Sequence, residues 1–373
     1  MKIGITCYPT YGGSGVVASE LGMELAKRGH EVHFLSYEMP FKISRYCKNI
    51  YFHEVEVLEY PLFKYPPYSL SLSVKMAEIF ESANLDIMHV HYAIPHAVSA
   101  YLTQRILGEG SNFRFITTLH GTDITIVGNH SSFFKMTKFC IENSNGITCV
   151  SNYLKHLTKE TFNINKEIEV IYNFVDTSKY KKNILDKSKL GIIKKNEFGI
   201  IHISNFRPVK KIKNIIEIFC RIRKQLECRL MLVGDGPDLA FAKEAVKRLD
   251  LSDKVVFLGR MDNVIPLLNS ADLYLLPSKS ESFGVSALEA LSCSVPVIGT
   301  NVGGLKEVVK EGKSGYLFNP EDIEGMSNSA LDILGSKNKL NKMKEEARKT
   351  ALMFDSKVII PKYIEYYKKI KKS

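Results

Sequence analysis

Residues 2–36 read KIGITCYPTYGGSGVVASELGMELAKRGHEVHFLS, and their pattern is the strongest indication of the fold class. The first of them, residues 2–8, form a short apolar run that is typical of a β-strand, and a glycine-rich turn follows. Residues 14–28 have apolar side chains at helical spacing, and residues 31–36 return to the strand pattern. This order of strand, helix and strand predicts a parallel sheet with helices on both faces, an α/β fold.

The same alternation continues along the chain. Further strands are expected at residues 50–57, 86–91, 113–118 and 146–150, and helices at 70–83, 95–107, 132–143 and 151–161. After a polar, lysine-rich segment the alternation begins again. Strands are expected there at residues 198–204, 229–234, 254–258, 272–276 and 296–299, with helices between them, one over 283–291. The second half therefore repeats the architecture of the first. A final helix at 357–371 has an apolar and tyrosine-rich stripe, which suits packing across a domain junction or on one domain alone.

Length and composition favour two folded domains. The chain has 373 residues, of which 45% are hydrophobic and 24% charged, enough for two cores. Much of the net charge of +11 comes from scattered lysines that are typical of solvated surface, so nucleic-acid binding is not expected. These include Lys181, Lys182, Lys187 and Lys189, and four lysines between 368 and 372.

The cysteines and the apolar runs bear on the compartment. The seven cysteines are odd in number and contain no C-x-x-C pair, which favours a reducing compartment, and we expect the cytoplasm. The sequence shows neither a secretion signal nor an apolar run long enough to span a membrane.

The first strand-to-helix turn has the residues of an anion site. Gly13, Gly15 and Ala18 fit a relaxed G-x-G-x-x-G/A pattern, in which glycines let a ligand approach the backbone N–H groups at a helix N-terminus. The anion can be a pyrophosphate, a phosphate or a carboxylate. The pattern therefore leaves open an NAD(P)-dependent oxidoreductase, with Glu38 as the acceptor of a ribose hydrogen bond.

Histidines gather near the ends of two strands in the first half. The run from His89 to His96 suggests a metal site, but no carboxylate or cysteine joins it at ligand-like spacing, so no metal is expected. We expect His91 or Tyr92 at the carboxyl end of a strand, where open α/β sheets bind ligands. His120 follows the next strand and is placed to contact a sugar or to donate a proton to a leaving phosphate.

The second half has a cluster of cations after its first strand. Arg207, Lys210 and Lys211 lie at an expected strand-to-helix turn. A guanidinium and two ammonium groups at such a turn suit a diphosphate, whose charge grows as it departs. The run Gly234-Asp235-Gly236-Pro237 after the next strand is a tight turn.

Two carboxylates frame a second strand-to-helix turn. Glu281 is expected before the helix and Glu289 two turns along it, with apolar residues and Gly284 between them. Both acids can then accept hydrogen bonds from the hydroxyls of one extended ligand, a sugar and a ribose. The pair Gly303-Gly304 supplies another close backbone approach near the same edge.

Together these residues resemble the retaining glycosyltransferases of family 4. The resemblance rests on E-x7-E at Glu281–Glu289, on Val233–Pro237 and on the basic loop Arg207–Lys211. It implies a GT-B fold, in which two Rossmann-like domains face each other across a cleft. Residues 1–172 with a C-terminal helix at about 355–373 would bind the acceptor, and residues 173–354 the nucleotide sugar.

A closer resemblance, along nearly the whole chain, is to the family members that attach N-acetylglucosamine to L-malate in the first step of bacillithiol biosynthesis. The stretches that carry it are Ile3–Thr10, Gly12–Val17, Tyr51–Val55, Tyr65–Tyr68, His89–His96, Thr117–Thr125, Tyr172–Phe174 and His202–Lys211. It implies UDP-N-acetylglucosamine as donor and retention at the anomeric carbon. It also implies small-molecule substrates, no cofactor and no metal, in keeping with the lack of a D-x-D sequence; a homodimer is possible.

The resemblance also assigns roles to residues. Catalytic roles fall to His120, Arg207, Lys211 and Glu281. Donor binding falls to Gly13, Asn205, Arg207, Lys210, Lys211, Gly234, Glu281, Phe283, Gly284, Val285 and Glu289. Acceptor binding falls to Gly12, Gly13, Ser14, Tyr92, Thr118, His120 and Arg207. The family's arginine lies five residues before its lysine, a place that Asn205 takes relative to Lys210, so the division of roles among the three cations stays open.

Three alternatives stand beside this hypothesis. One is the NAD(P)-dependent oxidoreductase. Another is a family 4 enzyme with a lipid or polysaccharide acceptor, for which residues 65–68 and 133–135 would supply an apolar, basic patch. A third is a protein that binds a sugar nucleotide without turnover.

Overall fold

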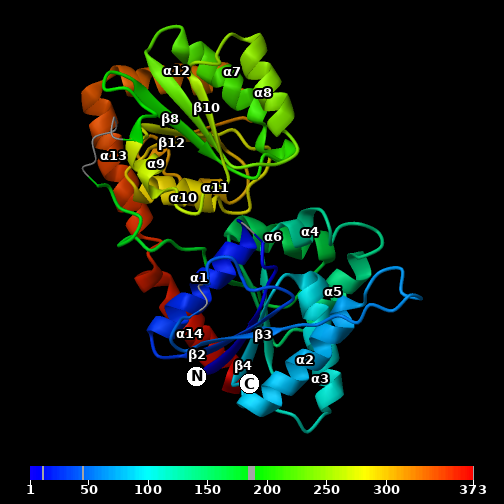
Figure 1. Ribbon diagram of the computed structural model, residues 1–373. Coiled ribbons are helices and arrows are strands. Elements are labelled where there is room, and N and C mark those ends of the chain that lie inside the picture. Colours follow the sequence, from blue (N-terminus) through cyan, green and yellow to red (C-terminus); the bar gives the residue numbers. More distant parts are fainter. Residues whose placement is uncertain (11, 44–45, 184–189, 373) are drawn as a thin grey trace. The chain divides into compact units, whose positions relative to one another are not determined.

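The computed structural model describes residues 1–10, 12–43, 46–183 and 190–372 (Figure 1). Tyr11 of the glycine-rich turn, and Lys187 and Lys189 of the lysine-rich segment, lie outside these ranges. The chain forms two compact units, which are described separately. Unit 1 comprises Met1–Asn173 with Lys357–Ser373, and unit 2 comprises Phe174–Ser356.

Unit 1 is built on a parallel sheet whose strand order is β3-β2-β1-β4-β5-β6-β7. Its strands are β1 (Lys2–Thr6), β2 (Glu31–Ser36), β3 (Ile50–Glu54), β4 (Ile87–His91), β5 (Phe115–Leu119), β6 (Gly146–Cys149) and β7 (Glu169–Val170). Its helices are α1 (Ser14–Lys27), α2 (Tyr68–Ala83), α3 (Val98–Leu107), α4 (Thr122–Thr125), α5 (Phe134–Asn143), α6 (Asn152–Phe162) and α14 (Ser356–Lys372). In Figure 1, α1 and α14 lie on one side of this sheet and α2, α3 and α5 on the other.

Unit 2 repeats this plan with the strand order β10-β9-β8-β11-β12-β13, and its strands are also parallel. Its strands are β8 (Phe198–Ile203), β9 (Cys228–Val233), β10 (Val255–Gly259), β11 (Leu273–Leu276), β12 (Val297–Thr300) and β13 (Gly315–Phe318). Its helices are α7 (Ile212–Arg223), α8 (Leu239–Arg248), α9 (Ile265–Ser270), α10 (Val285–Ser292), α11 (Leu305–Val308), α12 (Ile323–Gly335) and α13 (Lys337–Leu352). The predicted α/β architecture with two parallel sheets is confirmed.

The sequence pattern explains why these segments form these elements. Every residue of β5 and β11 is buried, as expected of parallel strands that are covered on both faces. Helix α7 instead buries one stripe, which includes Ile212, Ile215, Ile216, Phe219 and Ile222, at the spacing of an amphipathic helix. The stripe joins the core of unit 2.

Several expected boundaries were wrong, for local reasons. The helix expected from residue 95 is divided: a π-helical segment covers Ala93–Ala97, interrupted at Ile94 (φ −127°, ψ 130°), which precedes a proline, and the α-helix itself begins at Val98. The helix expected from residue 283 begins at Val285, because Gly284 has φ 97°. Strand β3 ends at Glu54, three residues early. The sequence pattern missed β7 and β13, which have only two and four residues.

Helix α14 packs its tyrosines on the sheet of unit 1. The Tyr367 hydroxyl lies 2.7 Å from Nδ1 of His89 on β4, and the Tyr366 hydroxyl accepts a hydrogen bond from the N–H of Ile147 on β6. Tyr363 and Tyr367 are fully buried. The stripe predicted on the last helix therefore completes the core of unit 1.

The strand order places the candidate sites. It reverses between β1 and β4 in unit 1, and between β8 and β11 in unit 2. At such a switch point the following connections leave in opposite directions, which opens a place for a ligand at the carboxyl ends of the strands. Among the described residues, no helix is long and apolar enough to cross a membrane, and no three His, Cys, Asp or Glu side chains are arranged to hold a metal ion.

Candidate functional site

In unit 2, the switch point joins a lysine and a glutamate that are far apart in the sequence. Lys210 follows β8, and Glu281 follows β11. The Lys210 ammonium donates a hydrogen bond to Oε1 of Glu281 at 2.6 Å. The two side chains are only 17% and 9% exposed, so each charge depends on the other for compensation. The sequence predicted both residues for the site, and the reversal of strand order brings them into contact.

Glycines hold the Glu281 loop in place. The N–H of Gly304 donates to the carbonyl oxygen of Glu281 at 2.9 Å. Gly303 has φ +57°, and a Cβ there would overlap that same carbonyl oxygen. Only glycine tolerates both conditions at once. The Gly303-Gly304 pair therefore positions the backbone of Glu281.

The loop after β9 supports the loop after β8. Gly234 has φ +125°, and a Cβ there would overlap the carbonyl oxygen of Ser204. A Cβ at Gly236 would overlap the carbonyl oxygen of Asn205 in the same way. The turn that the sequence indicated is thus a backbone-to-backbone contact, and it fixes the start of the loop that contains Arg207.

Glu289 lies closer to the start of its helix than expected. It is the fifth residue of α10, about one turn along and not two, because Gly284 delays the start of the helix to Val285. Burial, and to a smaller degree the negative charges of Glu281 and Glu289, raises the pKa of Tyr274. The Tyr274 hydroxyl donates a hydrogen bond to the carbonyl oxygen of Ile203 at 3.0 Å and accepts one from the Ser286 hydroxyl at 2.8 Å. The two acids of the E-x7-E pattern thus both contribute to the electrostatic field at Tyr274.

The three cations of the basic loop have different surroundings. Lys210 belongs to the buried pair, whereas Lys211 contacts the exposed carboxylate of Glu321 at 3.4 Å. Arg207 is exposed, with an extended backbone of φ −84° and ψ 156°. Asn205, which takes the place of the family's arginine, is also exposed. The geometry therefore separates Lys210, which touches Glu281, from Lys211, which does not.

In unit 1, the switch point joins the glycine-rich turn to the end of β4. Ser14, the first residue of α1, donates a hydrogen bond from Oγ to the Tyr92 hydroxyl at 2.9 Å. Gly12 and Gly13 precede the helix, with φ of 94° and 59°. His91 is the last residue of β4 and Tyr92 follows it, as predicted. The N-terminus of α1, whose first N–H groups attract anions, thus lies beside Tyr92.

His120 follows β5 and contacts two residues from the end of β4. Its Nε2 lies 2.8 Å from Nδ1 of His91, and its ring centre lies 5.2 Å from that of Tyr92. Burial lowers the pKa of His120 to about 3, so the imidazole is neutral at pH 7. Sequence reasoning selected His120 and missed the function of His91 as its partner. The sequence contained a signal for this pair, since His91 ends β4 and His120 directly follows the neighbouring strand β5.

Thr118 lies deeper than the other predicted acceptor residues. It is fully buried, and its hydroxyl lies 2.6 Å from Nε2 of His89 and 2.5 Å from the hydroxyl of Thr148. The structure does not bring this hydroxyl to Ser14 and Tyr92. Its part in acceptor binding stays a prediction.

Asp123 was not predicted, yet it ties the two strand ends together. Its carboxylate accepts hydrogen bonds from the backbone N–H groups of His120 at 3.1 Å, Gly121 at 2.8 Å and Ala93 at 3.2 Å. Burial raises the pKa of Asp123 to about 6, although these hydrogen bonds lower it. The sequence feature that could have indicated Asp123 is its position three residues after His120. At this spacing an aspartate side chain can accept hydrogen bonds from the backbone of its own turn.

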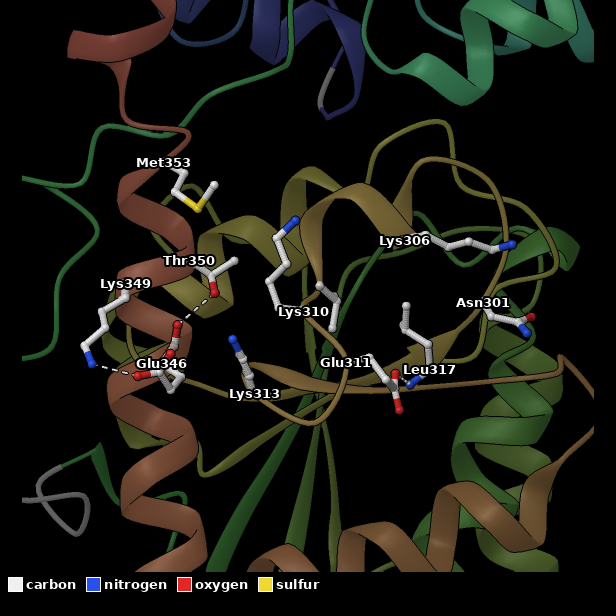
Figure 2. A pocket seen from close by; sticks show the side chains of 11 residues that line it. Asn301, Lys306, Lys310, Glu311, Lys313, Leu317, Glu346, Lys349, Thr350 and Met353 are labelled. Atoms are coloured by element: carbon white, nitrogen blue, oxygen red, sulfur yellow. Dashed lines mark hydrogen bonds and ion pairs between the residues drawn. The ribbon is translucent and has the colours of Figure 1, made fainter.

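Unit 2 also has a cavity of about 800 Å³ beside α11, β13 and α13 (Figure 2). Its lining includes four lysines, Lys306, Lys310, Lys313 and Lys349. Glu346 in the lining is paired with Lys349, and Glu311 accepts a hydrogen bond from the N–H of Leu317. No residue that the sequence predicted for the site lines this cavity. The switch points are therefore the stronger candidates.

Comparisons with known proteins agree with this geometry. Residues 11–179 match the family described as Glycosyltransferase Family 4, and residues 184–350 match Glycosyl transferases group 1. The chain belongs to the family 4 glycosyltransferases. It is 46% identical, over 98% of its length and 96% of the relative, to the N-acetyl-alpha-D-glucosaminyl L-malate synthase of Bacillus anthracis. It is 30% identical, over 92% of its length and 88% of the relative, to an uncharacterized glycosyltransferase of Methanocaldococcus jannaschii.

Solved structures show the same fold. Anabaena HepE in complex with UDP and glucose matches with a TM-score of 0.82 and 20% identity, covering 98% of this chain and 99% of that one. A glycosyltransferase from Rickettsia africae matches with a TM-score of 0.81 and 23% identity, covering 100% and 99%. The predicted GT-B fold class and glycosyltransferase family are confirmed, and the oxidoreductase alternative is not favoured.

Proposed function

We propose that this enzyme transfers N-acetylglucosamine from UDP-N-acetylglucosamine to the hydroxyl of L-malate, with retention at the anomeric carbon, as the first step of bacillithiol biosynthesis. The observation that carries the proposal is the 46% identity to the Bacillus anthracis synthase over almost the whole of both chains. The two switch points agree with it, because one is ionic and suits a nucleotide diphosphate, and the other has a helix N-terminus that suits a small carboxylate.

We assign the donor to unit 2. Arg207 and Lys210 would hold the diphosphate, Glu281 the transferred sugar and Glu289 the ribose. The contact between Lys210 and Glu281 supports these assignments. The sugar and the diphosphate are adjacent in the donor, so the two members of one ion pair can contact one group each. The backbone of Phe283, Gly284 and Val285 would approach the same ligand where the left-handed Gly284 opens the start of α10.

The chemistry that we propose needs no protein nucleophile. The bond between the anomeric carbon and the diphosphate oxygen breaks, and the malate hydroxyl oxygen bonds to that carbon on the same face. The hydroxyl proton passes to the departing phosphate. Arg207 and Lys210 stabilise the charge that grows on the diphosphate, with Lys211 adding to the local positive potential. The residues of the site thus act by position and charge.

We assign the acceptor to unit 1. The N–H groups at the start of α1, next to Gly12 and Gly13, would bind a malate carboxylate. Ser14 and Tyr92, which are hydrogen-bonded to each other, would orient the acceptor, and His120 would contact the reacting groups. The nearby imidazoles are neutral, so the helix N-terminus is the positive element of this site.

The compartment and the assembly are also proposals. None of the seven cysteines, all of which are among the described residues, forms a disulfide, which supports a reducing compartment, and we place the enzyme in the cytoplasm. A homodimer stays a prediction, which sedimentation of the purified protein would test.

The test is to incubate the protein with UDP-N-acetylglucosamine and L-malate, and to measure UDP release and the new glycoside by mass spectrometry. Succinate, which has both carboxylates but no hydroxyl, is the matched control and should give no glycoside. UDP release at the same rate with and without malate would refute malate as the acceptor and would leave the glycosyltransferase class intact. Product formed only with a lipid or polysaccharide would support the alternative acceptor.

A further inference from the structure

His91 and His120 share a hydrogen bond, and the distance alone does not show which of the two rings donates the proton. Nδ1 of His91 and Nε2 of His120 lie 2.8 Å apart, and the two rings stack with centres 5.0 Å apart and 24° between their planes. Burial lowers the pKa of His120 to about 3 and holds that of His91 well below its usual range. Both rings are therefore neutral at pH 7, and each bears one proton.

Two arrangements of these protons satisfy the bond. In the first, His91 donates from Nδ1, and His120 accepts at Nε2 and bears its own proton on Nδ1. In the second, His120 donates from Nε2, and its Nδ1 is a bare acceptor. The two arrangements therefore present opposite chemistry at Nδ1 of His120, the nitrogen that His91 does not occupy.

The other nitrogen of His91 decides between them. Nε2 of His91 is buried and has no hydrogen-bond partner among the described residues. In the first arrangement this atom is an unprotonated acceptor, and in the second it is an N–H donor. A buried N–H without an acceptor is the rarer condition in folded proteins, and leaving such a donor unsatisfied is costly. The first arrangement is favoured.

Two further contacts limit the position of His120 indirectly, one through its own backbone and one through His91. The Asp123 carboxylate accepts from the backbone N–H groups of His120 and Gly121, which fixes the turn. His91 itself is held, because Nδ1 of His96 donates to its carbonyl oxygen at 2.5 Å. Backbone and ring are thus set by separate residues, Asp123 for the first and His91 for the second.

We infer that His91 is a positioning residue that donates its Nδ1 proton to His120, so that neutral His120 presents Nδ1–H as a hydrogen-bond donor to an oxygen of the substrate. The substrate part of this inference rests on the proposed function, in which His120 lies in the site. Hydroxyl, carboxylate and phosphate oxygens of sugar and acceptor all accept hydrogen bonds. The opposite tautomer would direct a lone pair at them.

The first test is the tautomer itself. In protein labelled with ¹⁵N, long-range ¹H–¹⁵N correlation distinguishes a protonated Nδ1 from a protonated Nε2 in a neutral imidazole. We expect Nδ1–H for His120 in the free wild-type protein at pH 7. An Nε2–H tautomer would overturn the inference, whether or not the enzyme uses malate, so this result is independent of the proposed function.

The second test uses variants of His91. His91→Phe keeps a ring but removes the donor, so we expect the Nδ1–H signal of His120 to give way to Nε2–H and kcat to fall about tenfold, with KM for both substrates within about twofold. His91→Asn retains an N–H near the position of Nδ1 and should recover most of kcat. A folded His91→Phe protein with unchanged His120 signals and unchanged kcat would overturn the inference.

A matched control comes from the other histidine pair of unit 1. Nδ1 of His33 and Nε2 of His53 also lie 2.8 Å apart, with rings stacked at 6°, on β2 and β3. His53→Asn removes one member of a pair with the same N–N distance outside the candidate site. It should leave both kcat and the His120 tautomer unchanged. If His91→Phe does not fold, the wild-type tautomer and the His91→Asn variant still decide the question.

Discussion

Units 1 and 2 share one plan but differ in the side chains at their switch points. In unit 1 the strand order reverses between β1 and β4, and Ser14, Tyr92 and neutral histidines meet there. In unit 2 it reverses between β8 and β11, and Lys210 and Glu281 meet there. The shared fold fixes where a ligand can bind, while the loops after the strands decide which charge it can bring.

The difference follows from burial. The imidazoles of His89, His91 and His96 are completely buried and neutral, so they shape their site but add no charge to it. Lys210 is partly exposed and Arg207 is exposed, which leaves both side chains able to contact a diphosphate. If this difference between the units is correct, four changes should have distinct effects.

The largest expected effect is in the ionic site of unit 2. Lys210→Ala should lower kcat/KM for the sugar nucleotide about 1000-fold, or about 4 kcal/mol, because it removes a charge from the diphosphate and leaves Glu281 without its partner. Steady-state kinetics with varied donor would measure it. Lys213→Ala, on the exposed part of α7, is the control and should change kcat/KM less than twofold. A Lys210→Ala enzyme with wild-type donor kinetics would show that the donor site is misplaced.

The next effect concerns the backbone that supports this site. Gly234→Ala should reduce the free energy of unfolding by about 3 kcal/mol, because the new methyl group overlaps the carbonyl oxygen of Ser204 and φ is +125°. Urea denaturation followed by circular dichroism would measure the change. Gly335→Ala at the end of α12, where a Cβ meets nothing within 4 Å, should shift it by about 0.5 kcal/mol at most. Equal effects for the two variants would contradict the role given to Gly234.

A smaller effect separates the two units by pH. Burial lowers the pKa of His89 to about 3 and of His96 to about 4, below the ordinary value of 6.5. The unfolded chain therefore binds protons first, and stability is lost as pH falls below 6.5. At pH 5 the loss is about 2 kcal/mol for each such histidine. Asp123 opposes this loss, because its pKa is raised to about 6 and it gains its proton first in the folded state.

Unit 2 has one histidine, His202, whose pKa burial lowers to about 3. We therefore expect unit 1 to lose more protection than unit 2 between pH 7 and pH 5. Hydrogen exchange measured peptide by peptide, with the rates corrected for the intrinsic effect of pH, would compare β4 and β5 with β8 and β11. Equal losses in the two units would contradict the comparison.

The smallest expected effect is that of metal removal. Cationic side chains are proposed to stabilise the departing diphosphate, so dialysis against EDTA should leave the transfer rate within about twofold of the untreated enzyme. The same assay after adding back Mg²⁺ is the control. A rate that collapses with EDTA and returns with Mg²⁺ would refute the proposal that the cations of unit 2 suffice.

The two α/β halves, the three strand-to-helix turns and the residue types at each of them could be predicted from the sequence. This was possible because apolar periodicity and glycine placement are local properties of the chain. Thus the residues themselves pointed to His120, Lys210 and Glu281, and the family resemblance implied Ser14, before any contact was known. The helix start at Val285 was missed, because the left-handed Gly284 is a property of the folded backbone.

Which of these residues touch could not be predicted and follows from the folded arrangement of the strands and loops. Lys210 and Lys211 are adjacent in sequence, yet one meets Glu281 and the other Glu321. His91 and His120 are 29 residues apart and share one hydrogen bond. Such contacts depend on strand order and on the direction of each loop, which result from the packing of the whole sheet and leave no periodic trace in the sequence.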